Sequence, residues 1–167
     1  LMATGVPSRA IWALGVTQII GYGTLYYAFS VLSPAIGVSF GWSAEWVFGA
    51  LSLALLVGGL MSPVAGHFAD RFGAARIMAV GSIFAAVTLS AAALAPNGTT
   101  FAAALIAMEV TAAFVLYPSA FAALVQLGGR NAQRSITHLT LIAGFASTLF
   151  WPLTAWLHTF LDWRAVF

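Results

Sequence analysis

Long apolar segments separated by short polar connections run along the whole chain. Five of them are rich in hydrophobic residues over their full length, at positions 10–33, 44–66, 76–95, 100–125 and 135–158. Each can cross a hydrocarbon layer about 30 Å thick, which takes roughly 20 helical residues at 1.5 Å each. Lipid leaves unpaired backbone groups without partners, and these segments are too long and too uniformly apolar for barrel strands. The pattern therefore predicts an all-α, polytopic transmembrane helical bundle.

Helix-breaking and polar residues mark the predicted connections. In chain order these are Pro34 with Gly37 and Gly41, then residues 70–73, 96–98 and 128–131, and lastly Asp162. Pro118 and Pro152 fall inside the fourth and fifth segments. We expect both to kink their helices, because proline removes an intrahelical hydrogen bond.

Composition supports a membrane protein and excludes several other classes. Hydrophobic residues make up 62% of the chain and charged residues 6%, against roughly a quarter charged in soluble domains. The net charge of +2 is too small for a nucleic-acid-binding face. The chain has no cysteine, which excludes disulfides and thiol ligands. His67, His138 and His158 are too far apart in the predicted topology for a metal site.

The arginines predict the orientation in the membrane. Five of the six fall on one side of the predicted bundle, namely Arg9, Arg71, Arg76, Arg130 and Arg134, and only Arg164 falls on the other. Positively charged connections remain in the cytoplasm. We therefore expect a cytoplasmic N-terminus and an external end after the fifth span.

The connection after the second segment carries a recognisable motif. Residues 66–76 read GHFADRFGAAR, with Gly66, Asp70, Arg71, Gly73 and Arg76 at characteristic spacing. This segment resembles the signature loop of the major facilitator superfamily: glycine, three residues, Asp-Arg, one residue, glycine, then basic residues that open the next helix. It also lies between spans two and three on the predicted cytoplasmic side, as in that family. Alanines stand at 74 and 75, where the family loop is often basic.

Other segments extend the resemblance over nearly the whole chain. Residues 161–167 are similar to the Gly-Trp-Arg turn that precedes the sixth span in the family, with Asp162 in place of glycine. Residues 18–30 and 116–121 resemble the first and fourth spans of bacterial monocarboxylate or oxalate–formate carriers, which implies residence in a bacterial plasma (inner) membrane. The family has twelve spans. The resemblance thus implies that residues 1–167 form a partial N-terminal transmembrane domain, with five spans of a six-span half, and that a C-terminal half is missing.

The resemblance also implies a role for the signature loop. In the family this loop latches the two halves together in one conformational state, which would fall here to Gly66, Asp70, Arg71, Gly73 and Arg76. The two glycines predict a tight turn with close backbone approach. The alternative is that the charges only set the orientation in the membrane.

Polar and aromatic residues in the spans are candidates for a substrate cavity. Gln18, Tyr22 and Tyr26 recur on one predicted face of the first helix. Because the family lines its cavity with spans one and four, Tyr117 joins them, and Trp151 is a candidate because it lies too deep for the membrane interface. Residues 21–23 and Pro118 also predict interruptions at matching positions of the two spans. The alternative is contact between helices through polar side chains.

Glu109 is the only ionisable residue predicted well inside a span. An ionised carboxylate near the bilayer centre costs several kcal/mol, and such residues usually have a function. We expect Glu109 to line the cavity and either to bind a cationic group or to couple transport to protons. The alternative is a neutral glutamic acid packed between helices.

These observations predict a secondary active transporter that moves a small solute across the bilayer by alternating access. The sequence contains no nucleotide-binding motif, nucleophile elbow or metal-ligand spacing, so we expect no cofactor, no metal and no enzymatic activity. A small five-span membrane protein without transport activity, oligomeric and structural or sensory, is the alternative; an intramembrane enzyme comes third.

Overall fold

The computed structural model describes residues 6–167, which are helical over most of their length. The α-helices are α1 (Ser8–Tyr22), α2 (Ala28–Phe40), α3 (Ala44–Phe72), α4 (Ala74–Ala93), α5 (Gly98–Val115), α6 (Tyr117–Gly128), α7 (Ala132–Ala143), α8 (Phe145–His158) and α9 (Trp163–Val166). A π-helical segment, η1 (Gly23–Tyr27), joins α1 to α2, and a 3₁₀ turn, η2 (Gly129–Asn131), joins α6 to α7.

Five helical runs in the described part are long and apolar enough to cross a membrane. We number these spans in chain order: Ser8–Phe40, Ala44–Phe72, Ala74–Ala93, Gly98–Gly128 and Ala132–His158. Spans one, four and five each consist of two helices in succession, whereas spans two and three are single helices. The predicted all-α bundle with five transmembrane helices is confirmed.

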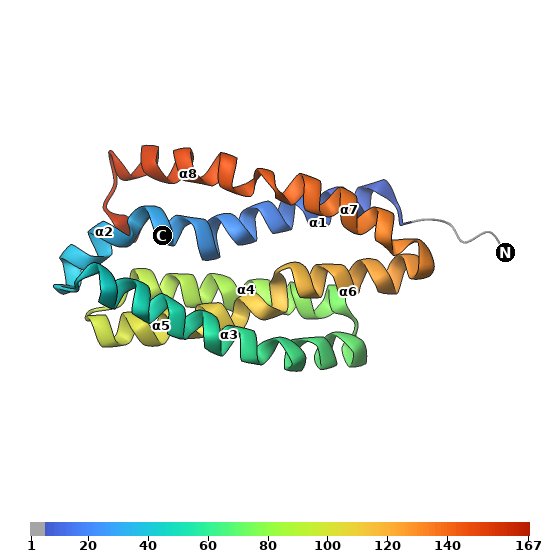
Figure 1. Ribbon diagram of the computed structural model, residues 1–167, viewed down its shortest axis with the longest axis horizontal. Helices are drawn as coiled ribbons and strands as arrows, with labels where there is room; N and C mark the ends of the chain where they lie inside the picture. Colours follow the sequence, from blue (N-terminus) through green and yellow to red (C-terminus); the bar gives the residue numbers. More distant parts are fainter. Residues whose placement is uncertain (1–5) are drawn as a thin grey trace.

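The spans run side by side along the long axis of the bundle (Figure 1). One end holds the start of α1, the α3–α4 turn and the α6–α7 connection, and we call it the turn end. The opposite end holds the α2–α3, α4–α5 and α8–α9 connections, and we call it the clamp end. Arg9, Arg71, Arg76 and Arg134 therefore lie toward the turn end and Arg164 lies at the clamp end.

The first span is longer than predicted, because Pro34 lies inside α2 instead of ending it. Proline at this position leaves the carbonyl of Ser30 without its usual backbone donor. The Ser33 hydroxyl donates to that carbonyl at 3.0 Å, so the helix continues to Phe40. It ends at Gly41, whose φ of 66° lies in the left-handed region that favours glycine.

The fourth and fifth spans are interrupted, but only one interruption coincides with a proline. Span four breaks at Leu116, and Pro118 lies in the first turn of α6. In span five, α8 continues through Pro152, and the junction between α7 and α8 lies at Gly144 instead. Proline is well tolerated in the first turn of a helix, where its missing N–H has no intrahelical partner to lose.

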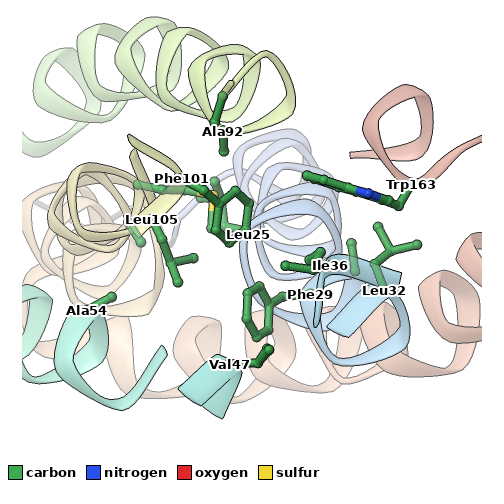
Figure 2. Close-up of a cluster of buried hydrophobic side chains, with 14 of the residues drawn as sticks. Leu25, Phe29, Leu32, Ile36, Val47, Ala54, Ala92, Phe101, Leu105 and Trp163 are labelled. Atoms are coloured by element: carbon green, nitrogen blue, oxygen red, sulfur yellow. The ribbon is translucent and has the colours of Figure 1, made fainter. Parts of the chain in front are cut away.

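A large apolar core lies between spans one to four and is closed by α9. Its largest side chains include Leu25, Phe29, Phe101, Leu105 and Trp163, all at most 2% exposed. Figure 2 shows these side chains converging from η1, α2, α5 and α9, with Ala54 of α3 and Ala92 of α4 beside them. A second buried cluster lies where the end of α3 and the start of α4 pack against α6 and α7. It consists of alanines together with Met78, Leu124 and Leu139.

Candidate functional site

The first span is interrupted near its middle by η1. A π-helical turn accommodates one extra residue, so side chains five positions apart become neighbours, and such turns often occur at functional sites. The rings of Tyr22 and Tyr27 accordingly lie 6.4 Å apart. Tyr26, predicted to share the face of Tyr22, is turned outward and is 42% exposed. The side chain next to Tyr22 on the buried side is thus Tyr27, and Tyr26 lies at the exposed margin of the predicted series of Gln18, Tyr22 and Tyr26.

The fourth span is interrupted at Leu116, whose backbone is extended. This break frees carbonyl groups at the end of α5 from their usual donors. The Ser119 hydroxyl donates to the carbonyl of Ala113 at 3.2 Å, and Nε2 of Gln18 donates to the carbonyl of Val115 at 2.9 Å. Span one thus supplies a hydrogen bond that the break in span four requires.

Gln18 is completely buried at this junction. Its Nε2 is paired as described, whereas its Oε1 has no hydrogen-bond partner among residues 6–167. Buried polar atoms are nearly always paired, so an unpaired acceptor at a helix break marks a place where a further donor would be stabilised.

The two interruptions face each other. The rings of Tyr22 and Tyr117 lie 4.7 Å apart, and Tyr117 stacks on Phe121 at 5.1 Å. Tyr26 and Tyr27 are in edge contact at 5.4 Å, so all four tyrosines of the chain gather here. Gly21 and Gly23 flank Tyr22 in the sequence, and these glycines predicted the interruption of the first span. A regular α-helical repeat does not place Tyr27 next to Tyr22, so Tyr27 is not among the predicted cavity residues.

Trp151 does not face the interior of the bundle, where the sequence placed it. Its side chain is 53% exposed on the surface of α8. The neighbouring Phe150 faces the first span instead, because a Cβ at Gly23 would overlap its ring. The absence of a side chain at Gly23 thus gives Phe150 its place beside the π-helical turn.

Glu109 lies in α5 at the contact with α3. It is 6% exposed, and its Oε1 is buried without a hydrogen-bond partner in the described part of the chain. The two helices approach closely here, since a Cβ at Gly58 would lie 2.6 Å from the Glu109 carbonyl oxygen. Glu109 is therefore a buried carboxyl group between spans two and four.

The signature motif forms a turn of one residue. Gly73 alone joins α3 to α4, with a φ of 90° that strains any residue with a side chain. Asp70 and Arg71 belong to the last turn of α3 and Arg76 to the first turn of α4, and all three are exposed. Gly66 differs from expectation, because it lies within α3 and a Cβ there would meet no other atom within 4 Å. Only Gly73 makes the tight turn.

The segment at the clamp end ties several helices together. Trp163 is 1% exposed and donates from Nε1 to the Ser39 hydroxyl at 2.7 Å. The Arg164 guanidinium donates to the carbonyls of Ala93 and Ala95, at 2.8 and 2.7 Å, and lies 4.5 Å from the Trp163 ring. Arg164 thus donates hydrogen bonds to carbonyls at and just beyond the end of α4.

These features define an integral membrane protein whose spans one and four are interrupted at facing positions. The sequence profile of the Major Facilitator Superfamily matches residues 12–167, and the chain belongs to this superfamily of membrane transporters. The match identifies the superfamily and no subgroup within it. Comparison with curated proteins found no match, and comparison with solved structures found none.

Proposed function

We propose that the chain is part of a secondary active transporter that moves a small solute by alternating access. The observation that supports this proposal is the ring contact of Tyr22 and Tyr117 where spans one and four are both interrupted. Transporters bind their solutes near the bilayer midplane between broken helices of this kind. The tyrosines offer aromatic faces and hydroxyl groups, and Gln18 adds an amide with an unpaired acceptor.

In this proposal the cavity is shared with a C-terminal half that follows the present chain. Gln18, Tyr22, Tyr27 and Tyr117 contribute from the first half, with Tyr26 at the exposed margin. Trp151 lies on an exposed surface, which suits a contact with the second half better than a place in this bundle. Glu109 binds a cationic group or carries the proton whose gradient drives transport.

We also infer that the α3–α4 turn acts as the conformational latch at the cytoplasmic side of a bacterial inner membrane. Asp70, Arg71 and Arg76 are exposed beside a turn whose direction Gly73 determines, so they are available to another part of the transporter. The N-terminus lies on the same side in this orientation, because positive charge gathers at the turn end.

The experiment for the transport proposal tests whether a reagent can reach the tyrosine cluster from both sides of the membrane. A single cysteine replaces Tyr26 in the complete gene product, otherwise free of cysteine, and an impermeant maleimide is applied to right-side-out and to inside-out vesicles. Alternating access predicts labelling from both sides. A cysteine at Leu25, which is 2% exposed, is the matched control and should be labelled from neither. Labelling of the Tyr26→Cys protein from one side only, or from neither, contradicts the proposal.

A further inference from the structure

The one-residue turn between α3 and α4 is held by a side chain from span four. Gln126 lies in α6, near the turn end of the bundle. Its Oε1 accepts a hydrogen bond from the backbone N–H of Ala74 at 2.9 Å. Its Nε2 donates to the carbonyl of Ala69, also at 2.9 Å. A single amide group therefore binds one residue on each side of Gly73.

The two backbone groups that Gln126 binds both lie at helix ends. The N–H of Ala74 belongs to the first turn of α4, where N–H groups have no intrahelical acceptor. The carbonyl of Ala69 belongs to the last turn of α3 and also accepts from the Gly73 N–H at 3.0 Å, so Gln126 gives it a second hydrogen bond. Both alanines are completely buried, so water cannot pair these groups in place of the protein. Loss of Gln126 would leave the Ala74 N–H without its acceptor and would remove one of the two donors to the Ala69 carbonyl. Only a side chain that carries a donor and an acceptor together can bind both groups, which an amide does and a carboxylate does not.

Small residues allow α6 to approach the turn closely enough for these bonds. Ala69 and Ala74 form a buried cluster with Ala120, Ala123 and Leu124 of α6. By contrast, Asp70, Arg71 and Arg76 point away from this contact and are exposed. The position of the turn backbone on α6 therefore determines where the three charged groups are presented.

We propose that Gln126 is the positioning residue of the latch turn and makes the turn move as one body with span four. The proposal rests on the proposed function, because a latch has meaning only in a transporter that changes conformation. Span four carries Tyr117 at its interruption and Gln126 near its end. The helix that contributes to the solute site is thus bonded directly to the turn that carries the latch charges.

The test uses Gln126→Glu and Gln126→Leu in the complete gene product with the single cysteine at Tyr26. The ratio of labelling rates from the two membrane faces reports the balance of conformations. It is measured at pH 7 and near pH 3.5, where a carboxyl group that titrates near pH 4.3 is mostly protonated. At pH 7 the introduced carboxylate accepts from Ala74 but cannot donate to Ala69. A latch at the cytoplasmic end would keep that end closed, so a misplaced latch should shift the ratio toward cytoplasmic labelling. We expect a shift of about fivefold, the population change that one lost hydrogen bond produces.

Acidic pH should reverse the effect in Gln126→Glu alone. A glutamate protonates near pH 4.3, and its hydroxyl can then donate to the Ala69 carbonyl while the other oxygen accepts from Ala74. Gln126→Leu should keep its shifted ratio at both pH values. Gln133→Glu is the matched control, since it adds the same charge on an exposed residue near the start of α7, away from the turn, and should match the parent protein.

The outcomes separate the two proposals. If the parent protein is labelled from one side only, the proposed function fails. If the parent is labelled from both sides and Gln126→Glu behaves like Gln133→Glu at every pH, the positioning role alone is wrong. Failure of both Gln126 variants to insert, when Gln133→Glu inserts normally, also overturns it, because Gln126 is then needed for folding and not for positioning.

Discussion

Glu109 carries a carboxyl group that is almost completely buried between two membrane spans. Transfer of a charged side chain to the centre of a membrane helix costs about 2.5–3.5 kcal/mol on insertion scales. The close contact with Gly58 leaves no room for water on the α3 side of its backbone. In the proposed transporter, binding of a proton and binding of a cation are the tasks open to such a carboxylate.

The first prediction is that Glu109→Gln uncouples transport without abolishing solute movement. The amide keeps the size of the side chain but cannot take up a proton or neutralise a cation. For a proton-coupled solute we expect gradient-driven uptake into proteoliposomes to fall about a hundredfold, at the low end for loss of a proton-transfer group. Exchange of labelled for unlabelled solute should remain.

Its matched control is Glu45→Gln, which removes the same charge from an exposed residue in the first turn of α3. The solute would come from a screen of radiolabelled carboxylates, sugars and amino acids with the complete gene product. Loss of both uptake and exchange in Glu109→Gln would point to cation binding instead of proton coupling. Unchanged uptake and unchanged pH dependence would make Glu109 a packing residue.

The tyrosines show which contacts a regular helical repeat predicts and which it does not. A spacing of four residues correctly brings Gln18 and Tyr22 to the protein side of span one, and both are at least half-buried there. The π-helical turn then shifts the repeat by one residue, so that Tyr27 follows Tyr22. At this turn Phe150 from span five occupies the space beside Gly23, where a side chain would not fit. A single span read alone contains no information about that partner.

At the scale of helices, side chains pair the backbone carbonyls that are freed at Pro34 and at the break in span four. Ser33 pairs the carbonyl freed by Pro34, Ser119 pairs Ala113, and Gln18 of span one pairs Val115 of span four. Breaks satisfied in this way are ordered structural features, and lipid-exposed irregular backbone would be too costly. The glycines and prolines near residues 21–23 and 118 made these positions predictable, whereas the donors that stabilise them were not.

The second prediction concerns the two glycines of the signature motif, which have different roles. Gly73 has a φ of 90° and a ψ of 126°, a conformation that costs a residue with a side chain about 1–3 kcal/mol, so Gly73→Ala should lower the unfolding temperature and impair transport. Gly66 is helical with open space around it, so Gly66→Ala should be neutral or stabilise by up to about 1 kcal/mol. Thermal unfolding of both variants in the same detergent provides the comparison.

Equal effects of the two substitutions would contradict this assignment. A harmless Gly73→Ala would mean that the turn adopts another backbone conformation in the membrane. A harmful Gly66→Ala, with normal stability but reduced transport, would mean that a second half of the transporter packs closely on this face of α3. The pair therefore distinguishes strain within the turn from contact with another part of the protein.

At the scale of the whole molecule, the charges are unequally shared between the two ends of the bundle. The turn end carries four described arginine side chains, and the clamp end carries Arg164 alone. The Arg164 guanidinium is bound to the carbonyls of Ala93 and Ala95 and lies 5.4 Å from the Phe40 ring, so it is held against the protein but keeps its positive charge. The positive charge that orients a membrane protein is thus concentrated at the turn end.

The five spans could be predicted because lipid imposes their length and composition on each segment separately. The superfamily could be recognised because one short motif lies at a sharp turn between two of these segments. Contacts between segments far apart in the chain could not be predicted, as shown by the bonds of Gln126 to Ala69 and Ala74 and of Trp163 to Ser39. Each depends on the relative placement of helices, which hydropathy does not encode.

The last prediction tests the orientation with two single cysteines. Ala75 is exposed beside the latch turn, whereas Ala74 is buried, so Ala75→Cys reports the turn end. Thr99→Cys reports the clamp end and avoids Asn97, whose side chain accepts a hydrogen bond from the Thr100 N–H and caps α5. Because the arginines gather at the turn end, that end should be cytoplasmic. Impermeant maleimide on intact cells should therefore label Thr99→Cys, and should label Ala75→Cys only after the cells are permeabilised. The reverse result would place the latch turn outside the cell, and equal labelling at both sites would mean that the chain inserts in both orientations.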